Sequence, residues 1–147
     1  MDNKIIVGID HGNRNMKTAS SVFSAVIQPI QTKPDSLENI LEYQNKFYYV
    51  GGKVPEKEMV DKTVNEDYYL LTLAALAKEM RNRNLTDAFV RLGTALPPRR
   101  FQEQKDNFKK YLMKTKELHF RYEGIHYHVS LDNVYVFMQG HVVIHTL

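Results

Sequence analysis

The sequence contains no cysteine among its 147 residues. Disulfide bonds and thiolate metal sites are therefore excluded, and the composition is typical of a reducing cytoplasm, where we expect this protein to lie. No apolar run approaches the roughly 20 residues that a membrane-spanning helix needs. The amino terminus is also too polar, and its apolar stretch before Asp10 too short, for a secretory signal. We therefore expect no membrane partner.

A large excess of charge is also absent. The formal net charge is +3, and 43% of the residues are hydrophobic, which is ordinary for one globular domain of this length. Residues 99–116 hold seven basic residues and two acids. This segment could contact DNA phosphates or an acidic protein, but a solvated helix face has the same composition. Because no base-reading motif accompanies it, we do not expect direct nucleic-acid binding.

The first third of the sequence predicts strands. Residues 4–9 form a nearly continuous apolar run, typical of a strand buried on both faces. Residues 18–30 are rich in β-branched residues and serine, and their proline restricts them to the edge of a sheet. Residues 37–52 predict two short strands joined through Gln44 and Asn45.

Two helices are expected in the middle of the chain. Residues 66–84 are rich in alanine and leucine, with acids at the start and arginines at the end, as the helix dipole favours. Asn65 is the expected cap. The apolar residues spread around most of this helix, so we expect it to be covered on more than one side. Residues 99–113 predict an amphipathic helix with Phe101 and Phe108 on one face and lysines opposite.

Two more apolar runs, at 87–94 and 134–138, predict buried strands. Helical crossovers separate them from each other and from the strand at 4–9, so the three should lie parallel in one sheet. Residues 118–131 alternate on both sides of Glu123-Gly124, which predicts a hairpin inserted before the last strand. We therefore expect an α/β fold whose mixed sheet has three leading antiparallel strands and helices on both faces.

The carboxyl-terminal residues 142–147 are mainly apolar and carry no glycine, proline or charged stop signal. Chain termini are usually polar. We expect the chain to end inside a helix that starts near residue 139, and to be a piece of a longer protein.

The stretch "VGIDHGNRNMK", residues 7–17, turns from a strand into a polar corner. A phosphate held by such a turn needs inward-pointing backbone amides and a residue with positive φ, which we expect Gly12 to supply. Asp10, at the end of the strand, could hold Mg²⁺, mainly through water. In the plain alternative, Asp10 caps the turn and Lys17 is solvated, and the stretch alone favours that alternative. The candidate phosphate-binding residues are Gly12, Asn13, Asn15 and Lys17.

The longer stretch "IIVGIDHGNRNMK" resembles the first phosphate motif of the actin and heat-shock chaperone superfamily, a strand followed by Asp-x-Gly, then Asn or Thr and a Lys. Further similar features follow in order: "NKFYYVGG", an apolar helix with "VRLGTALP", a lysine-rich helix, a hairpin and "VYVFMQG". Together they resemble the N-terminal domain of ParM-like bacterial actins, which are plasmid-segregating filament ATPases. The resemblance covers nearly the whole chain. The opening motif and "VYVFMQG" are moderately specific, whereas the helices and hairpin are not.

The resemblance implies a ribonuclease-H-like domain over residues 1–147, the first half of a two-half ATPase that binds ATP or GTP with Mg²⁺ between its halves. It gives Gln139 the role of orienting the attacking water, for which a neutral amide suffices; otherwise Gln139 merely begins a helix. It also implies that the full-length protein forms filaments, with a DNA-bound adaptor protein as a candidate partner. The 147-residue chain alone is then expected to be inactive. His11 and Ala95 depart from the pattern, where an apolar or small residue and a glycine are more usual.

Two other readings of function stay open. One is a non-enzymatic ribonuclease-H-like binding module that contacts DNA or an acidic protein through the basic helix 99–116. The other is half of a sugar or acetate kinase, although no clear catalytic acid is visible. The histidine pairs at 126 and 128 and at 141 and 145 each share a face, but neither has a convincing third ligand, so a metal site there is not expected.

Overall fold

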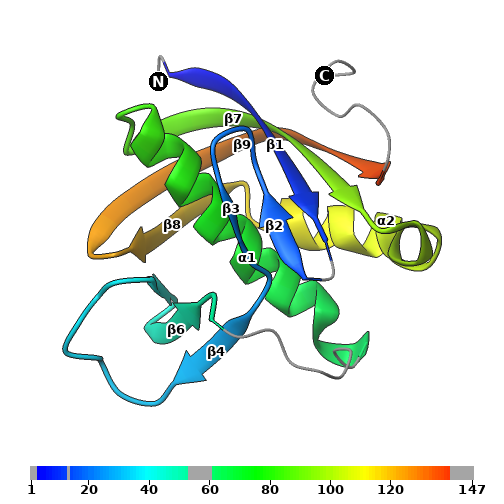
Figure 1. Ribbon diagram of the computed structural model, residues 1–147. Coiled ribbons are helices and arrows are strands. Elements are labelled where there is room, and N and C mark those ends of the chain that lie inside the picture. Colours follow the sequence, from blue (N-terminus) through cyan, green and yellow to red (C-terminus); the bar gives the residue numbers. More distant parts are fainter. Residues whose placement is uncertain (1–2, 13, 53–60, 140–147) are drawn as a thin grey trace.

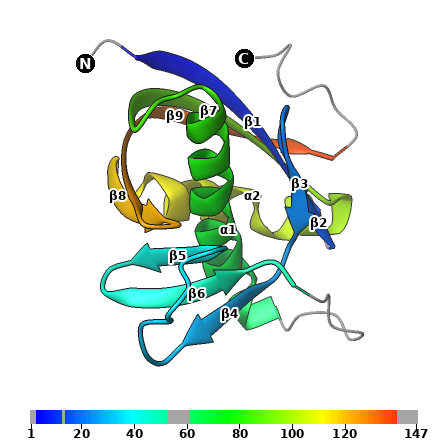
Figure 2. The same ribbon diagram turned by 60° about the vertical axis from the view of Figure 1, so that its left-hand side comes forward.

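The computed structural model describes residues 3–12, 14–52 and 61–139, without the side chains of residues 61–65 and 100. In this part of the chain, nine strands form one mixed sheet that curls around a long helix (Figures 1 and 2), in the order β3-β2-β1-β7-β9-β8-β5-β6-β4. The elements are β1 (Lys4–His11), β2 (Asn15–Lys17), β3 (Val22–Ser24), β4 (Ile27–Ile30), β5 (Ile40–Tyr43), β6 (Lys46–Val50), α1 (Asp61–Asn82), β7 (Asp87–Leu96), α2 (Pro98–Met113), β8 (Glu117–Tyr122) and β9 (Ile125–Met138).

The three leading strands are antiparallel, as predicted. β1 pairs with β2, which sets Asp10 opposite Lys17, and β2 pairs with β3, which sets Met16 opposite Phe23. Strand β2 is only three residues long. The chain therefore reverses twice within a short distance of the carboxyl end of β1.

The parallel centre of the sheet is also confirmed. β7 lies between β1 and β9 and is parallel to both. Val7 and Ile9 of β1 and Val90 and Leu92 of β7 are buried on the inner face of the sheet, where the helices lie. The carboxyl ends of β1, β7 and β9 consequently meet at one edge of the sheet.

The hairpin predicted at 118–131 is confirmed by the antiparallel pairing of β8 with β9, but the prediction that it is separate from the third parallel strand was wrong. Ile125–Met138 is one continuous strand whose first half pairs antiparallel with β8 and whose length also pairs parallel with β7. The extra residue Asp132 interrupts the register with β7 and forms a bulge. Its neighbouring polar residues interrupt the apolar pattern, and for that reason the sequence suggested two elements. The turn itself lies where it was predicted, at Glu123 (φ 52°) and Gly124 (φ 82°).

Strands β4, β5 and β6 lie at one end of α1, away from β1 and β7 (Figure 2). The β5–β6 hairpin turns through Gln44 (φ 51°) and Asn45 (φ 63°), as predicted. Pro29 lies in β4, which is an outermost strand of the sheet. Proline has no backbone N–H to donate, and in an outermost strand this does not interrupt the hydrogen bonds in the interior of the sheet.

Helix α1 begins earlier than the sequence predicted. It starts at Asp61, so Asn65 lies within the helix and is not its cap. The charged first turn has no apolar periodicity, and the sequence pattern could not separate it from a loop. All ten residues from 68 to 77 are buried. The expectation of a helix covered on more than one side is therefore confirmed.

Helix α2 matches its prediction closely, with Pro98 in the first turn, where proline is well tolerated. Phe108 and Leu112 are buried, whereas Lys105 and Lys109 are exposed. Both helices contact His11, so they lie on the same face of β1, and the predicted helix on the other face is not found among the described residues. The helix expected from residue 139 falls outside the described residues. Neither described helix is long and apolar enough to span a bilayer.

Candidate functional site

Asp10, Lys17 and Gln139 meet at the edge where the parallel strands end. Asp10 lies near the carboxyl end of β1, and Gln139 directly follows β9. Only β7 separates these two strands in the sheet. In α/β proteins, ligands bind outside the carboxyl ends of parallel strands, and this edge is therefore the candidate site.

A hydrogen bond joins the two ends of the described chain at this edge. The Gln139 side-chain amide donates through Nε2 to Asp10 Oδ1 at 2.7 Å, across 129 positions of sequence. The backbone amide of Gln139 donates to the carbonyl of Leu96 at 2.7 Å. Since a carboxylate only accepts, the amide nitrogen must face Asp10, and the amide oxygen Oε1 of Gln139 faces elsewhere. Gln139 is thus fixed from both its backbone and its side chain.

Lys17 lies on the same face of the sheet as Asp10, because the two residues are directly opposed in the antiparallel β1–β2 pair. Its side chain is exposed. Within the described ranges Lys17 forms no ion pair. Arg14 and Asn15 are also exposed at the tip of the turn, whereas Asn13 falls outside the described residues.

Gly12 differs from its prediction. Its φ is not positive, and its amide donates to the carbonyl of Asn15 at 3.0 Å. A Cβ at this position would lie 2.6 Å from the Asn15 carbonyl oxygen. Glycine is therefore required by the close approach of the two strands rather than by a left-handed backbone. In this conformation the Gly12 amide is bonded within the protein and does not point toward a ligand.

The one carboxylate that the described residues place at this edge, Asp10, suits Mg²⁺ better than it suits Ca²⁺ or Zn²⁺. Asp10 accepts one hydrogen bond from Gln139 at Oδ1, and its second carboxylate oxygen remains to accept from a metal-bound water. Mg²⁺ retains several waters and binds proteins through one or two carboxylates together with substrate phosphates. The donor set of this chain therefore fits the ion expected with a nucleotide.

His11 is the residue beneath the site that the sequence did not single out for a role. It is fully buried, and its Nε2 lies 2.7 Å from Thr72 Oγ1 on α1. Burial lowers the pKa of His11 to about 3, although the nearby carbonyls of Ile9 and Tyr68 act in the opposite direction. A signal was present in the sequence: His11 follows Val7 and Ile9 with a period of two, which predicts the inner face of the strand.

The histidines of the β8–β9 hairpin contact one another across the two strands. His119, from β8, lies beside the predicted pair, with its Nδ1 3.3 Å from His126 Nε2 and its ring stacked on His128 at 4.5 Å between ring centres. His128 is bonded to Asp87 and Glu117. Among the described residues, no three histidine or acidic side chains are arranged to hold a metal ion.

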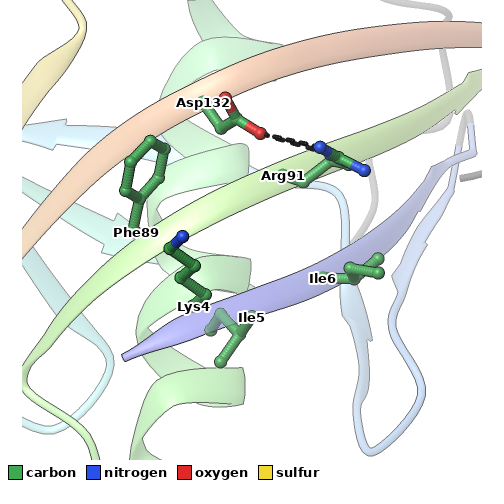
Figure 3. Close-up of a pocket in the computed structure, with 6 residues that line it drawn as sticks. All are labelled: Lys4, Ile5, Ile6, Phe89, Arg91 and Asp132. Carbon is green, nitrogen blue, oxygen red and sulfur yellow. Dashed lines mark hydrogen bonds and ion pairs between the residues drawn. The ribbon is translucent and has the colours of Figure 1, made fainter. Parts of the chain in front are cut away.

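A pocket of about 500 Å³ lies elsewhere on the sheet (Figure 3). Lys4 and Ile6 of β1 line it, together with Phe89 and an Arg91–Asp132 ion pair of 3.1 Å. Lys4 precedes Asp10 by six positions, a distance of about 20 Å along a strand. This pocket is therefore separate from the candidate site.

The chain was compared with known families after this geometry was established. The family described as the N-terminal domain of actin-like proteins matches residues 8–141, which is nearly the whole chain. A comparison with curated protein sequences finds no significant match.

Solved structures share the fold. A filament of AlfA bound to AMPPNP is 19% identical, with a TM-score of 0.66, over 93% of this chain and 55% of that one. ParM of Bacillus thuringiensis in its apo form is 13% identical, with a TM-score of 0.67, over 95% and 46%. The apo ParM of psk41 is 15% identical, with a TM-score of 0.64, over 94% and 50%.

The chain spans about half the length of these structures. Because their sequence identity is low, the structural likeness to these proteins supports the fold alone, namely the predicted actin-like, ribonuclease-H-like architecture. The match over residues 8–141 identifies the family itself. The chain belongs to the family of actin-like protein N-terminal domains.

Proposed function

We propose that this chain is the N-terminal half of a filament-forming ATPase of the plasmid-segregation type. The observation that carries the proposal is the contact between Asp10 and Gln139 at the end of the parallel strands. Two structures with the same fold support it: AlfA was solved as a filament with AMPPNP, and Bacillus thuringiensis ParM was solved with ATP. The second half, the remaining phosphate contacts and the nucleoside pocket would follow in the longer protein.

In this proposal each residue of the edge has a separate task. Asp10 would hold Mg²⁺ through water, and the ion would supply positive charge to neutralise the phosphate oxygens. Lys17 would bring a second positive charge to the face of the sheet that carries Asp10. Asn13 and Asn15 would donate side-chain hydrogen bonds to the phosphate oxygens. Gly12 allows the hairpin to close tightly, and its amide stays with Asn15.

Gln139 would orient the attacking water. Its nitrogen is engaged by Asp10, and its amide oxygen is therefore the group that can accept a hydrogen bond from water. Orientation of the nucleophile together with charge neutralisation is most of what phosphoryl transfer requires from a protein. ATP and GTP are both compatible with these contacts, since the described residues address phosphates and not a base.

Filaments and an adaptor complete the proposed role. A plasmid-segregating filament needs self-association of the full-length protein and a DNA-bound adaptor protein as its link to cargo. The exposed lysines of α2 are not needed in this proposal, because an adaptor and not the filament contacts the DNA.

The decisive test has two stages. A reading frame that continues beyond Leu147 should encode a second glycine-rich Asp-x-Gly turn after a strand. The protein carrying both halves should then hydrolyse ATP with Mg²⁺ and sediment as filaments. Calorimetry on the 147-residue chain alone should detect weak nucleotide binding or none. A two-half protein that neither binds nucleotide nor assembles would refute the proposal.

A further inference from the structure

The buried His11 connects the phosphate hairpin, the turn between β1 and β2, to both helices. Its Nε2 lies 2.7 Å from Thr72 Oγ1 of α1. The rings of Tyr68 from α1 and Phe108 from α2 each meet the imidazole edge-on, with 5.2 Å between ring centres. The carboxyl end of β1 is thus in contact with both helices on the inner face of the sheet.

The hydrogen bonds determine which nitrogen of His11 carries the proton. Thr72 Oγ1 lies 2.6 Å from the carbonyl oxygen of Tyr68, which can only accept, so the Thr72 hydroxyl donates there. His11 Nε2 must then donate to Thr72 Oγ1. A neutral imidazole has one N–H, which leaves Nδ1 as an acceptor. Nδ1 is buried and has no hydrogen-bond partner in the part of the chain that the structure describes.

This arrangement leaves one buried polar atom of the ring unpaired among the described residues. A buried acceptor without a donor has lost its water and gained nothing in return. Val7 and Ile9, which share the inner face of β1, are aliphatic; a leucine at position 11 would remove the unpaired Nδ1 together with the hydrogen bond to Thr72. A buried polar atom without a partner calls for an explanation, and the explanation that we pursue is a functional requirement for the bond made by the other ring nitrogen.

We propose that His11 is a positioning residue that fastens the phosphate hairpin to α1 and so holds Asp10 in the direction that nucleotide binding needs. This inference rests on the proposed function. Tyr68 supplies a second link, since its hydroxyl donates to the Gly12 carbonyl at 3.4 Å. The hairpin is therefore tied to one helix through both a side chain and its own backbone.

The direction of Asp10 follows from the alternation of a strand. His11 lies between Asp10 and Gly12, and neighbouring side chains of a strand point to opposite faces. A ring fixed on the inner face fixes the rotation of the strand about its axis. The Asp10 carboxylate is thereby held on the outer face, toward Gln139 and opposite Lys17.

Three variants of the protein carrying both halves separate positioning from stability. His11→Leu fills the space without a hydrogen bond. His11→Gln retains an N–H donor at a reach similar to that of Nε2. His126→Leu makes the same change as the first variant at an exposed histidine on the opposite face of the sheet, and serves as the matched control.

We expect His11→Leu to weaken ATP binding by about tenfold, the worth of one hydrogen bond to a positioned group. His11→Gln should recover most of this loss, and His126→Leu should bind as the wild type does. The thermal midpoint of His11→Leu should stay within a few degrees of the wild-type value, because the lost bond to Thr72 is offset by removal of the unpaired Nδ1. Hydrogen exchange gives a readout that needs no activity: the Gly12 amide, which donates to Asn15, should exchange about tenfold faster in His11→Leu.

Wild-type affinity or wild-type Gly12 exchange in His11→Leu would overturn the inference. A loss of binding that only follows a lower thermal midpoint would also overturn it, because a merely structural residue predicts that result. Nitrogen NMR that finds the proton on Nδ1 of His11 would contradict the hydrogen-bond pattern. A wild-type protein that binds no nucleotide would refute the proposed function instead, and the Gly12 exchange rates would then decide the role of His11.

Discussion

Strand β9 has polar side chains at both of its ends, and the two ends are built differently. At the carboxyl end, Gln139 donates to Asp10, a partner 129 positions away, and both side chains are partly buried. At the amino end, His126 is exposed, and His128 bonds to acidic residues at the surface. Both ends collect polar groups from several strands, but among the described residues only the first end lies over a buried polar side chain, His11.

The contrast shows what distinguishes a candidate site from a polar cluster. Exposed contacts between charged groups contribute little, because water and salt compete with them. Side chains can act on a ligand when buried contacts fix their direction. By this criterion the carboxyl end of β9, at Asp10, is organised to bind a ligand, and the amino end, in the β8–β9 hairpin, is a solvated surface. The following experiments would break or sharpen that distinction.

The largest effect is expected at the carboxyl end. Gln139→Ala in the protein carrying both halves should slow ATP hydrolysis by about 100-fold and leave ATP affinity within about threefold, because water orientation acts mainly in the transition state. Single-turnover hydrolysis and equilibrium binding measure the two quantities. His128→Ala is the matched control and should hydrolyse at the wild-type rate. Equal losses in both variants would remove the distinction between the two ends.

The next effect is an acid sensitivity caused by His11. Burial lowers its pKa to about 3 in the folded state, whereas an unfolded chain has a value near 6.5. As the pH falls below about 6.5, the unfolded state binds a proton that the folded state does not, so stability decreases. The loss should approach about 1.4 kcal/mol per pH unit, or about 2 kcal/mol between pH 6.5 and 4.5.

Urea unfolding of the wild type and of His11→Leu at both pH values isolates this contribution, since other titrating groups, such as Glu79, remain in both proteins. The difference in free energy of unfolding between the two proteins should grow as the pH falls. His126→Leu should show little change, because that histidine is exposed. A difference that does not depend on pH would mean that His11 is accessible to protons.

The fold was predictable where local patterns decide it. The apolar runs of β1 and β7, the turn residues Gln44 and Asn45 and the stripe of α2 each carry their own signal. The parallel centre followed from the crossovers between these elements. The continuity of β9 was not predictable, because the bulge at Asp132 depends on register with β7.

The site was predictable only in part. Asp10 was named from its place at the end of the first strand and Gln139 through the family resemblance, and the parallel strands explain why the two residues meet. The sequence does not reveal whether a glycine is required by a positive φ or by the close approach of another chain segment. Gly12 is required by the close approach of the Asn15 carbonyl. The third histidine of the hairpin, His119, escaped notice because cross-strand neighbours are set by register and not by spacing in sequence.

Two turn glycines, one near each end of β9, should give smaller effects that test the same difference between the two ends. Gly12→Ala would place a Cβ 2.6 Å from the Asn15 carbonyl oxygen, which should cost about 2 kcal/mol of stability and weaken ATP binding by opening the hairpin. Gly124→Ala in the β8–β9 turn should cost about 1–2 kcal/mol, because its φ is +82°, without affecting ATP binding. Thermal melts and ATP titrations test both. Unchanged affinity in Gly12→Ala would show that the hairpin does not contact nucleotide.

The smallest effect belongs to His128. Hydrogen bonds to Asp87 and Glu117 raise its pKa above the ordinary value, so its stabilising contribution is complete below about pH 6.5 and is lost as the pH rises through the folded value. At the acid end the contribution ends when Glu117 is protonated, and the bonds from Ser130 and His128 lower the pKa of that carboxyl. His128→Asn should therefore lower the thermal midpoint near pH 5.5 by no more than about 2 °C and less at pH 8, because exposed pairs are weak. High salt should reduce the difference further. A larger shift, or an altered ATP affinity, would mean that the surface histidines are coupled to the carboxyl-end site and that the two ends of β9 act together.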